Sequence, residues 1–582
     1  MKKMILISII AVLQLLFFSP VSGQEITALV GGTIIRTEIN DSIPNSVILI
    51  QGKNIIDFGL QKKIKIPENA KVVDIKGKYV IPGLTDSHIH FFQSGGLYTR
   101  PDAIDLRRRV PYKETELKGI LDNITGMFKE YISCGVTSVA DLGGPMFNFD
   151  IREKAAGIVQ APNVFCSGPL ISSYQPEALT TDDPPIIRVN SIKEALDLVK
   201  KQIEKNTDYI KIWYISSNNL RKGAVDVNEF YPIVQAIVKE AHKNNLPVFV
   251  HATELETAKK ALQAGCDVLV HSVTDREVDD EFLSLCKKNN SIYIPTLWVF
   301  KSYEAVFSKQ IKLLKIEQLR ANPMTIGTFF DMKELAASEL SVRAKKFVDN
   351  PKPIEIDSVI LINLKKVHDY GITIAMGTDA GNIGVLHGPS IYREFIYMKQ
   401  AGMTNFEILQ SATLNGAKVI RSEKTLGTID KGKLACLLVL NSNPLNDILN
   451  TEDIKYVIKN GSIIDEQKIL IHTPQELAQI QLNAYNSRDI ESFLSVYDSN
   501  VIVHNFPDNK EKMNGIEPMR KAYTGLFNDS PNLYCKLVNR ITNNNFVIDQ
   551  EKVSGLPGRN ILNAVAMYQI KNGLITDVWF LP

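Results

Sequence analysis

The sequence lacks an excess of charge of either sign. Its 66 Lys and Arg residues nearly balance its 64 Asp and Glu residues, and the formal net charge is +2. A protein without a strong field of one sign is poorly suited to a nucleic-acid polymer, so we expect no nucleic-acid partner. Hydrophobic residues make up 45% of the chain and charged residues 22%. These proportions are ordinary for folded domains, and they exclude whole-chain disorder, collagen and coiled coil.

The sequence has no long apolar run after its N-terminal stretch, so only that stretch could enter a bilayer. There, Lys2 and Lys3 precede an apolar run at 4–18, and Val21-Ser-Gly offers small residues for cleavage. The run is short for a membrane-spanning helix, and the pattern is typical of a signal peptide. We therefore predict a signal peptide at 1–23, an exported protein that is periplasmic or secreted, and no stable membrane insertion after cleavage. A retained N-terminal anchor is the alternative.

Cysteine pairs are missing too. The six cysteines are scattered, and none forms a Cys-x-x-Cys motif. A chain of 582 residues can bury sizeable hydrophobic cores without disulfides, so we interpret most of these cysteines as small buried hydrophobes. Because export implies an oxidising compartment, one disulfide stays open as an alternative.

The length of the chain suggests several domains. Residues 24–82 and 423–472 contain short β segments separated by Gly and Asn turns. Neither flank is long enough to form a good sheet alone. We therefore expect the two flanks to pair into one composite β-sandwich beside a central domain.

The central domain, residues 83–422, repeats short apolar runs that end in polar residues and precede helical stretches. Eight such runs occur, at 80–90, 136–142, 163–169, 209–213, 247–252, 268–272, 292–297 and 372–379. Eight strands alternating with helices predict the α/β class and a (β/α)8 TIM barrel. Residues 300–355 are Lys-rich and longer than an ordinary barrel connection. They form either a lid over the barrel mouth or a solvated helical excursion.

The pattern changes again after residue 472. Residues 473–582 open with an amphipathic helix at 474–486, which Thr473 caps together with Glu476 three residues later. Several strand-like runs follow this helix. We predict a separate α+β domain at 473–582.

The most informative segment is Thr-Asp-Ser-His-Ile-His, which contains His88 and His90. Two histidines at i and i+2 on a strand point to the same side. At the C-terminal end of a barrel strand, that side faces the site. Neutral imidazoles in this arrangement are good ligands for zinc or a similar divalent metal, so the segment predicts a metal site.

Four more ligand-type residues fall at or near predicted strand ends. His251 ends the fifth run, His271 the sixth and Asp379 the eighth, while Lys211 lies in the fourth run between two isoleucines. An ammonium buried among apolar side chains is costly, so we expect a lowered pKa for Lys211. The neutral amine can then be carboxylated to N6-carboxylysine, whose carbamate can bridge two metal ions.

Several ordered motifs extend this pattern along the chain. They are Pro-Gly-Leu-Thr-Asp-Ser-His-Ile-His at 82–90, Gly-Val-Thr-Ser-Val at 135–139, Asp-Tyr-Ile-Lys-Ile at 208–212, Val-Phe-Val-His-Ala at 248–252, Gly-Thr-Asp at 377–379 and His-Gly at 387–388. With these motifs the sequence resembles the amidohydrolase superfamily, in the branch related to imidazolonepropionase and the bacterial Xaa-Pro dipeptidases. The resemblance covers about 27–470, and the number and order of the motifs make it highly specific.

The resemblance implies a binuclear site with zinc as the expected metal. One ion would be bound by His88, His90 and Asp379, the other by His251 and His271, and carboxylated Lys211 would bridge the two. A metal-bridging hydroxide would attack the scissile carbonyl, and Asp379 would shuttle a proton to the leaving nitrogen. The expected activity is hydrolysis of amide C–N bonds in a small-molecule substrate, such as an N-acyl amino acid or a dipeptide. A homo-oligomer is an open expectation.

Two loop residues are candidate substrate contacts. His387 follows the eighth run, where it either touches substrate or braces the loop. Tyr174 lies in the loop that reads Leu-Ile-Ser-Ser-Tyr-Gln-Pro. Dipeptidase-like relatives often carry Gly-Gly-His at that place, so the resemblance does not settle a dipeptide specificity.

An alternative within enzymes is a mononuclear deaminase or a cyclic-amide (imidazolone-type) hydrolase. It would use Glu254, which follows His251 closely, as an acid or base. A Glu in the first turn of a helix more commonly complements the helix dipole. The deaminase-like branch would not need a lysine in the fourth strand, so Lys211 favours the binuclear interpretation.

Residues 473–582 resemble the SnoaL-like (NTF2-like) fold, through Ser-Arg-Asp-Ile-Glu-Ser-Phe at 487–493 and Leu-Ile-Thr-Asp-Val-Trp at 574–579. This fold can hold an apolar pocket or serve as a dimer surface. His504, Asp549 and Glu551 are candidate polar lining residues, and ordinary surface or core roles are the more common alternative. A non-catalytic small-molecule binding protein that uses this domain is therefore the alternative of another class.

Overall fold

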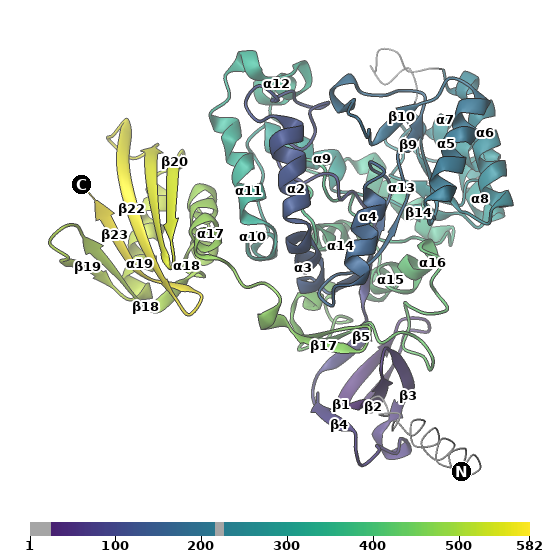
Figure 1. Ribbon diagram of the computed structural model, residues 1–582, viewed down its shortest axis with the longest axis horizontal. Helices are drawn as coiled ribbons and strands as arrows, with labels where there is room; N and C mark the ends of the chain where they lie inside the picture. The colour runs from purple at the N-terminus through teal and green to yellow at the C-terminus, as the bar shows by residue number, and fades with distance from the viewer. Residues whose placement is uncertain (1–24, 216–225, 582) are drawn as a thin grey trace, which may run out of the picture.

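The structure is a computed structural model that describes residues 25–215 and 226–581. Figure 1 shows a central body of helices and strands, a sheet that contains the N-terminal strands, and a C-terminal domain at one side. The predicted signal peptide at 1–23 lies outside the described residues, so export stays a prediction. Across the described ranges, no helix combines the length and the apolar character needed to cross a membrane.

The two flanks of the chain pair into one sheet. Strand β5 (Tyr79–Pro82) runs parallel to β1 (Ile26–Arg36) on one side and antiparallel to β15 (Leu437–Leu440) on the other. The strand order is β17-β16-β15-β5-β1-β2-β3, with β4 paired to β1. The remaining strands are β2 (Asp41–Gln51), β3 (Asn54–Leu60), β4 (Lys71–Asp74), β16 (Ile454–Lys459) and β17 (Ser462–Asp465). The flanks thus form a composite unit, but its hydrogen bonds make one eight-stranded sheet where we predicted a sandwich.

The central body contains two parallel sheets. One has three strands in the order β6-β7-β8, and the other has six in the order β10-β9-β11-β12-β13-β14. Their bounds are β6 (Leu84–Ile89), β7 (Val136–Asp141), β8 (Asn163–Cys166), β9 (Leu170–Ser172), β10 (Ile186–Arg188), β11 (Ile210–Trp213), β12 (Val248–His251), β13 (Val268–Val270) and β14 (Ile292–Ile294). Seven of the eight predicted runs therefore contain a strand.

The two parallel sheets do not join into one regular eight-stranded ladder. The eighth run, 372–379, forms no strand and makes isolated parallel bridges, from Ile374 to Tyr293 of β14 and from Ala380 to Ile89 of β6. On the side of β11 away from β12, the neighbouring strand is β9 and not β8. Strands β9 and β10, of three residues each, lie outside the predicted runs.

Helices alternate with the strands, as the sequence predicts. Three helices follow successive strands of the larger sheet: α5 (Ile192–Glu204), α6 (Val227–Lys243) and α7 (Leu255–Ala264). Their ends follow capping chemistry: the Ser191 side chain accepts from the Glu194 amide before α5, and Gly265 ends α7 at φ +91°. The other helices of this body are α2 (Lys118–Asp122), α3 (Ile124–Ser133), α4 (Asn148–Ala156), α8 (Asp280–Asn289), α13 (Ser358–Asp369), α14 (Ser390–Gln400), α15 (Asn405–Ser411) and α16 (Leu414–Val419).

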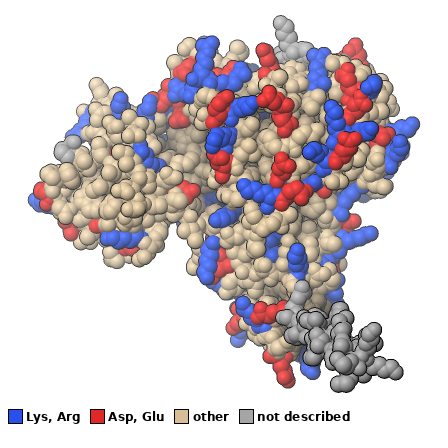
Figure 2. Space-filling view, viewed as in Figure 1, with Lys and Arg blue, Asp and Glu red and all other residues tan. Residues whose placement is uncertain are grey.

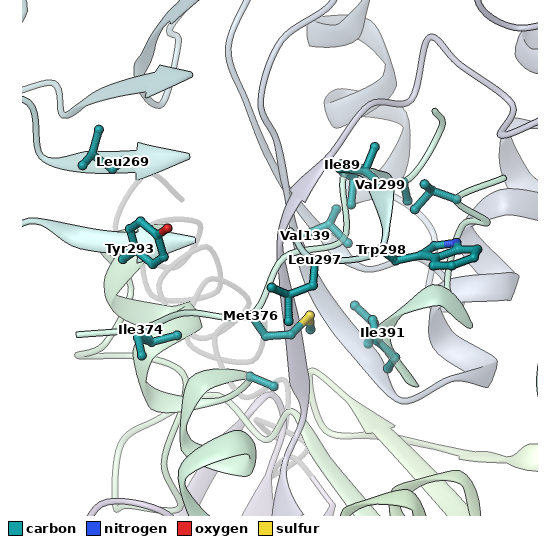
Figure 3. Packing of buried hydrophobic residues seen from close by; sticks show 14 of the residues in the cluster. Ile89, Val139, Leu269, Tyr293, Leu297, Trp298, Val299, Ile374, Met376 and Ile391 are labelled. Atoms are coloured by element: carbon teal, nitrogen blue, oxygen red, sulfur yellow. The ribbon is translucent and has the colours of Figure 1, made fainter. Parts of the chain in front are cut away.

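The core of the central body joins strands to the helices around them. Figure 3 shows Ile89 and Val139 from β6 and β7 near Leu297, Trp298 and Met376 of the loops beyond the strands. Burying such side chains contributes roughly 25 cal/mol per Å² of apolar surface removed from water. All six cysteines are buried and free, which confirms their interpretation as small core residues.

The segment 300–355 packs between the central body and the C-terminal domain. Its helices are α9 (Val299–Phe307), α10 (Lys315–Arg320), α11 (Pro323–Phe330) and α12 (Val342–Asp349). Helix α10 is anchored by a buried ion pair between Glu317 and Arg393 of α14. Helix α11 packs against the first helix of the C-terminal domain (Figure 1). A simple solvated excursion is therefore wrong, whereas closure as a lid stays a prediction.

The C-terminal domain is α+β, as predicted. Its six-stranded sheet has the order β19-β18-β23-β22-β21-β20. The domain opens with α17 (Pro474–Ser487), and the predicted capping box between Thr473 and Glu476 is present. The other elements are α18 (Ile490–Leu494), β18 (Tyr497–Asn505), β19 (Glu511–Asn514), α19 (Ile516–Asp529), β20 (Tyr534–Asn543), β21 (Phe546–Ser554), β22 (Ile561–Lys571) and β23 (Leu574–Leu581). On the face seen in Figure 2, charges of both signs intermingle over the central body and are sparser on this domain.

Candidate metal centre

Four histidines from three strands converge at one end of the parallel sheets. His88 lies on β6, His90 directly follows β6, His251 ends β12 and His271 directly follows β13. The ring centroids lie 4.9 Å apart for His88 and His271, 4.3 Å for His251 and His271, and 5.1 Å for His88 and His90. The four imidazoles therefore form one continuous cluster.

Asp379 joins this cluster from the eighth run. Its Oδ1 lies 3.2 Å from Nε2 of His88 and 3.1 Å from Nε2 of His90. Ligand atoms of His88, His271 and Asp379 all lie within 4.8 Å of one another, which allows them to hold a metal ion. Zinc accepts this combination of imidazole nitrogen and carboxylate oxygen.

Backbone strain accompanies two residues of the cluster. His271 has φ +81° and Asp379 has φ +63°, a region that non-glycine residues rarely occupy. Hydrogen bonds hold both conformations: the His271 amide donates to the Ile294 carbonyl at 2.8 Å, and the Asp379 amide to the His88 carbonyl at 2.7 Å. Such strain amounts to about 1–3 kcal/mol per residue and concentrates at functional sites.

Hydrogen bonds on the far side of two imidazoles set their orientation. Nδ1 of His90 lies 2.7 Å from the Gly143 carbonyl, and Nδ1 of His271 lies 2.7 Å from Oγ1 of Thr296. A carbonyl acceptor places the proton of His90 on Nδ1, so its Nε2 keeps a free lone pair that faces the cluster. This is the usual support for a metal-binding histidine.

Lys211 is buried in β11, with 1% of its surface exposed. Its Nζ has no hydrogen-bond partner among the described residues. Burial lowers the pKa of the Lys211 ammonium to about 7, opposed in part by the charge of Asp379. A large fraction of neutral amine is therefore present near neutral pH, and this is the form that can be carboxylated.

The charge states of the cluster fit a cation. Burial lowers the pKa of His271 to about 3 and that of His88 well below its usual value, so both imidazoles are neutral at pH 7. Although burial opposes it, the neighbouring imidazoles hold the pKa of Asp379 well below its ordinary value. Three buried polar atoms, Nδ1 of His88, Nζ of Lys211 and Oδ1 of Asp379, lack hydrogen-bond partners among the described residues. Neutral nitrogens beside an ionised, unsatisfied carboxylate match the donor set of a divalent metal.

Two buried carboxyl groups that sequence reasoning missed support the cluster. Asp86 accepts hydrogen bonds from the amides of His88 and Thr378 and from the Thr378 hydroxyl, which fastens β6 to the eighth run. Burial raises the pKa of Asp86 to about 7. Asp141 accepts from the amide of Gly143, whose carbonyl contacts His90. The available signal was the end of β7 for Asp141 and, for Asp86, its place in the Thr-Asp-Ser-His-Ile-His segment.

The two candidate substrate contacts lie in different settings. The ring nitrogens of His387 contact the Tyr131 hydroxyl at 2.8 Å and the Gln93 carbonyl at 2.7 Å, so the geometry favours the bracing role. Tyr174 is half-buried against Trp213, with ring centroids 6.0 Å apart, and Trp213 in turn contacts His251 edge-on at 6.0 Å. Tyr174 thus lies one ring away from the cluster.

Glu254, the alternative acid or base, is the N-cap residue of α7, and its side chain does not cap the helix. No hydrogen bond or ion pair within the described ranges joins it to the histidine cluster. The local role expected from the helix dipole fits this position better than a role in the cluster.

Parallel strands with buried His, Lys and Asp side chains gathered at one end define an α/β protein with a candidate metal site. The chain belongs to the amidohydrolase family, which its residues 79–464, more than half of the sequence, match. Residues 479–578 match the SnoaL-like domain. Family membership and the curated relatives make the protein a hydrolase that acts on C–N bonds.

Two curated relatives span most of the chain. A 5-methylthioadenosine/S-adenosylhomocysteine deaminase of Clostridium tetani is 22% identical over 472 residues, which is 75% of this chain and 93% of that protein. An imidazolonepropionase of Alkaliphilus metalliredigens is 22% identical over 467 residues, covering 74% of this chain and 92% of that protein.

Solved structures share the fold. A Xaa-Pro dipeptidase with bound methionine in the active site matches with a TM-score of 0.58 and 25% identity over 76% of this chain and 100% of that chain. A molinate hydrolase matches with a TM-score of 0.59 and 18% identity over 78% of this chain and 97% of that chain. These neighbours are prolidase-like amidohydrolases, and the resemblance predicted from the motifs is confirmed.

Proposed function

We propose that the protein is a metal-dependent hydrolase that cleaves amide C–N bonds in small molecules such as N-acyl amino acids or dipeptides. The observation that carries the proposal is the buried amine of Lys211, without a hydrogen-bond partner among the described residues, beside four imidazoles and Asp379. An isolated buried amine is costly unless it is modified or paired. The site would lie at the mouth of a closed (β/α)8 barrel, which the bridges of the eighth run to β14 and β6 support.

The convergence of these side chains supports the ligand set that the resemblance implies, and His88, His271 and Asp379 lie close enough together to share an ion. His88, His90 and Asp379 would hold one divalent ion and His251 and His271 a second, carboxylated Lys211 would serve both, and zinc is the preferred metal. Two such ions would lower the pKa of a shared water and polarise the scissile carbonyl.

The chain itself supplies orientation and proton transfer. Gly143 and Thr296 hold the rings of His90 and His271, and Asp86 keeps the first and eighth runs in register. Asp379, ionised at neutral pH, accepts a proton from the attacking water and passes it to the leaving nitrogen.

The substrate class is drawn from the relatives. The dipeptidase at 25% identity supports a dipeptide or an N-acyl amino acid, and such substrates are small molecules. A second candidate is deamination or cyclic-amide hydrolysis at a single metal, favoured by the two curated relatives that span most of the chain. The second candidate leaves the burial of Lys211 without a role.

The deciding experiment counts metal ions and follows Lys211. We expect about two ions per chain in the purified protein, and Lys211→Met to lose bound metal and about 10- to 100-fold or more of the activity toward a panel of N-acyl amino acids and dipeptides. Lys459→Met is the matched control, because Lys459 is also a buried lysine (5% exposed). It lies on β16 of the flank sheet, where its Nζ donates a hydrogen bond to Oδ1 of Asn163. One ion per chain, with Lys211→Met fully active, would instead support the mononuclear candidate.

We also propose export by the segment at 1–23. Expression of the full chain in a bacterial host should yield a processed protein in the periplasm or medium. N-terminal sequencing checks this, since a start near residue 24 is expected and a retained segment in the membrane fraction would contradict it.

A further inference from the structure

The C-terminal domain encloses a cavity of about 510 Å³ between its helices and its sheet. This volume falls in the range of small-molecule sites, roughly 300–1,000 Å³. The cavity is lined by side chains of α17, α19 and strands β18 to β23, and no residue of the histidine cluster takes part. It is therefore a site separate from the candidate metal centre.

The walls of the cavity are rich in aromatic rings. Tyr485, Tyr497, Tyr523 and Tyr568 all line it, as does Phe580. Leucine and valine side chains fill much of the remaining lining. The faces of tyrosine and phenylalanine rings attract organic cations, and aromatic cages are a recurrent means of holding them.

A buried carboxyl group lies among these rings. Glu551 lines the cavity and is 7% exposed. Its Oε1 accepts from the Tyr568 hydroxyl at a long 3.5 Å, and the same hydroxyl lies 3.5 Å from Oε1 of Gln481. The Cys535 thiol, which also lines the cavity, hydrogen-bonds Glu551 as well. A carboxylate offers about four acceptor positions, so these contacts leave Glu551 with acceptor capacity that faces the cavity.

No protein cation neutralises Glu551. The nearby guanidinium of Arg540 is bound by Asp549 through both carboxylate oxygens, at 2.7 and 2.6 Å. No salt bridge among the described residues includes Glu551. Lys512, an exposed lysine, also lines the cavity, and its Nζ lies 5.9 Å from the centroid of the Phe580 ring. A buried carboxylate without a counter-charge is costly, and a cation brought by a ligand would remove that cost.

We propose that this cavity is a binding site for a hydrophobic organic amine, whose ammonium group pairs with Glu551 inside the tyrosine cage. The apolar body of the ligand fills the leucine- and valine-lined part of the cavity. Glu551 selects the cation over a neutral or anionic molecule of the same shape, because an anion would be repelled and a neutral group would leave the carboxylate unpaired.

The experiment uses the full chain and three probes of matched shape: phenethylamine, phenethyl alcohol and hydrocinnamate. Isothermal titration at a pH above 8, where Glu551 with its pKa of about 7 is ionised, should detect phenethylamine binding, with phenethyl alcohol weaker by about tenfold and hydrocinnamate weaker still. Glu551→Gln should remove the preference for the amine and leave the alcohol unchanged. Tyr523→Leu should weaken the amine more than the alcohol, because it removes a ring face.

Two control variants locate the binding. Glu511→Gln changes an exposed glutamate on β19 and should leave all three affinities unchanged. Asp379→Asn alters the metal cluster and should also leave amine binding unchanged, which places the ligand outside the barrel. Equal binding of amine and alcohol by the native chain, full amine affinity in Glu551→Gln, or no binding of any probe would overturn the proposal.

Discussion

Replacing Asp379 should lower turnover far more than it lowers metal binding. Asp379→Asn keeps the size of the side chain and removes the charge that accepts a proton. The four histidines and Lys211 remain, so we expect most of the metal to stay bound while kcat falls by about 10²- to 10⁴-fold. Metal analysis and steady-state rates on the same preparation check this. Undiminished turnover would exclude Asp379 as the proton shuttle.

Glu551 makes the stability of the C-terminal domain depend on pH. Burial raises its pKa from the ordinary 4.5 to about 7, so the folded state holds the proton more tightly than the unfolded state. Its contribution to stability is therefore present below the unfolded pKa and is lost as the pH rises through about 7. We expect Glu551→Gln to raise the free energy of unfolding above that pH by about 1–3 kcal/mol.

Urea unfolding of the native chain and of Glu551→Gln, on both sides of this pH range, measures the difference. The gain of the variant should appear on the alkaline side and vanish in mild acid. Glu511→Gln, at an exposed position, should show no such pH dependence. A gain that appears only in acid would contradict the direction of the pKa shift.

The eighth run packs closely against β6 at Gly377, and a substitution of this glycine tests the contact. A Cβ added at Gly377 would lie 2.9 Å from Cβ and 3.0 Å from the amide nitrogen of His88, and 2.7 Å from Ile294. Because a backbone atom is among these neighbours, Gly377→Ala must displace β6 or the eighth run. We expect a loss of about 1–3 kcal/mol in stability and weaker metal binding.

Denaturant unfolding and metal content check this prediction. Gly119→Ala in α2 is the control, because a Cβ there meets nothing within 4 Å. That change should be neutral or slightly stabilising, since alanine is the better helix former. If Gly377→Ala behaves like Gly119→Ala, the eighth run and β6 do not pack as closely as in the structure.

At the scale of the whole molecule, the C-terminal domain is fastened to the segment 300–355 by buried polar groups. Nδ2 of Asn483 on α17 donates to the Pro323 carbonyl at the start of α11, at 2.7 Å. Oδ1 of Asn483 accepts from Gln479 at 2.9 Å. Asn483→Ala leaves these partners unsatisfied in the interface, and we expect it to cost about 1–3 kcal/mol.

The loss should appear as an earlier, separate unfolding transition of the C-terminal domain in calorimetry. Asn543→Ala, at an exposed end of β20, is the matched control and should leave the transition unchanged. Helix α17 thus lines the cavity at Glu551 and also contacts the segment 300–355. At the start of that segment, the ring centroid of Phe300 lies 6.1 Å from that of His271. An Asn483→Ala transition identical to that of the native chain would show that the domains are joined by other contacts.

The sequence by itself determined the type of the elements and the chemistry at their ends. The apolar runs placed His88 and His251 at or near strand ends, because alternation and burial are properties of a short stretch of chain. For Asp379 the run predicted the position in the cluster, but the run itself forms no strand. The pairing of the two flanks also followed, since neither could complete a sheet alone. The capping box at Thr473 was visible for the same local reason.

Only the tertiary structure decided the contacts between distant segments. The support of His271 by Thr296, the fastening of Asp86 to Thr378 and the short strands β9 and β10 arise from packing, not from any local pattern. The single eight-stranded sheet and the docking of α17 on α11 belong to the same group. Such contacts join residues far apart in the chain, and a one-dimensional pattern carries no information on which of many apolar or polar partners will meet.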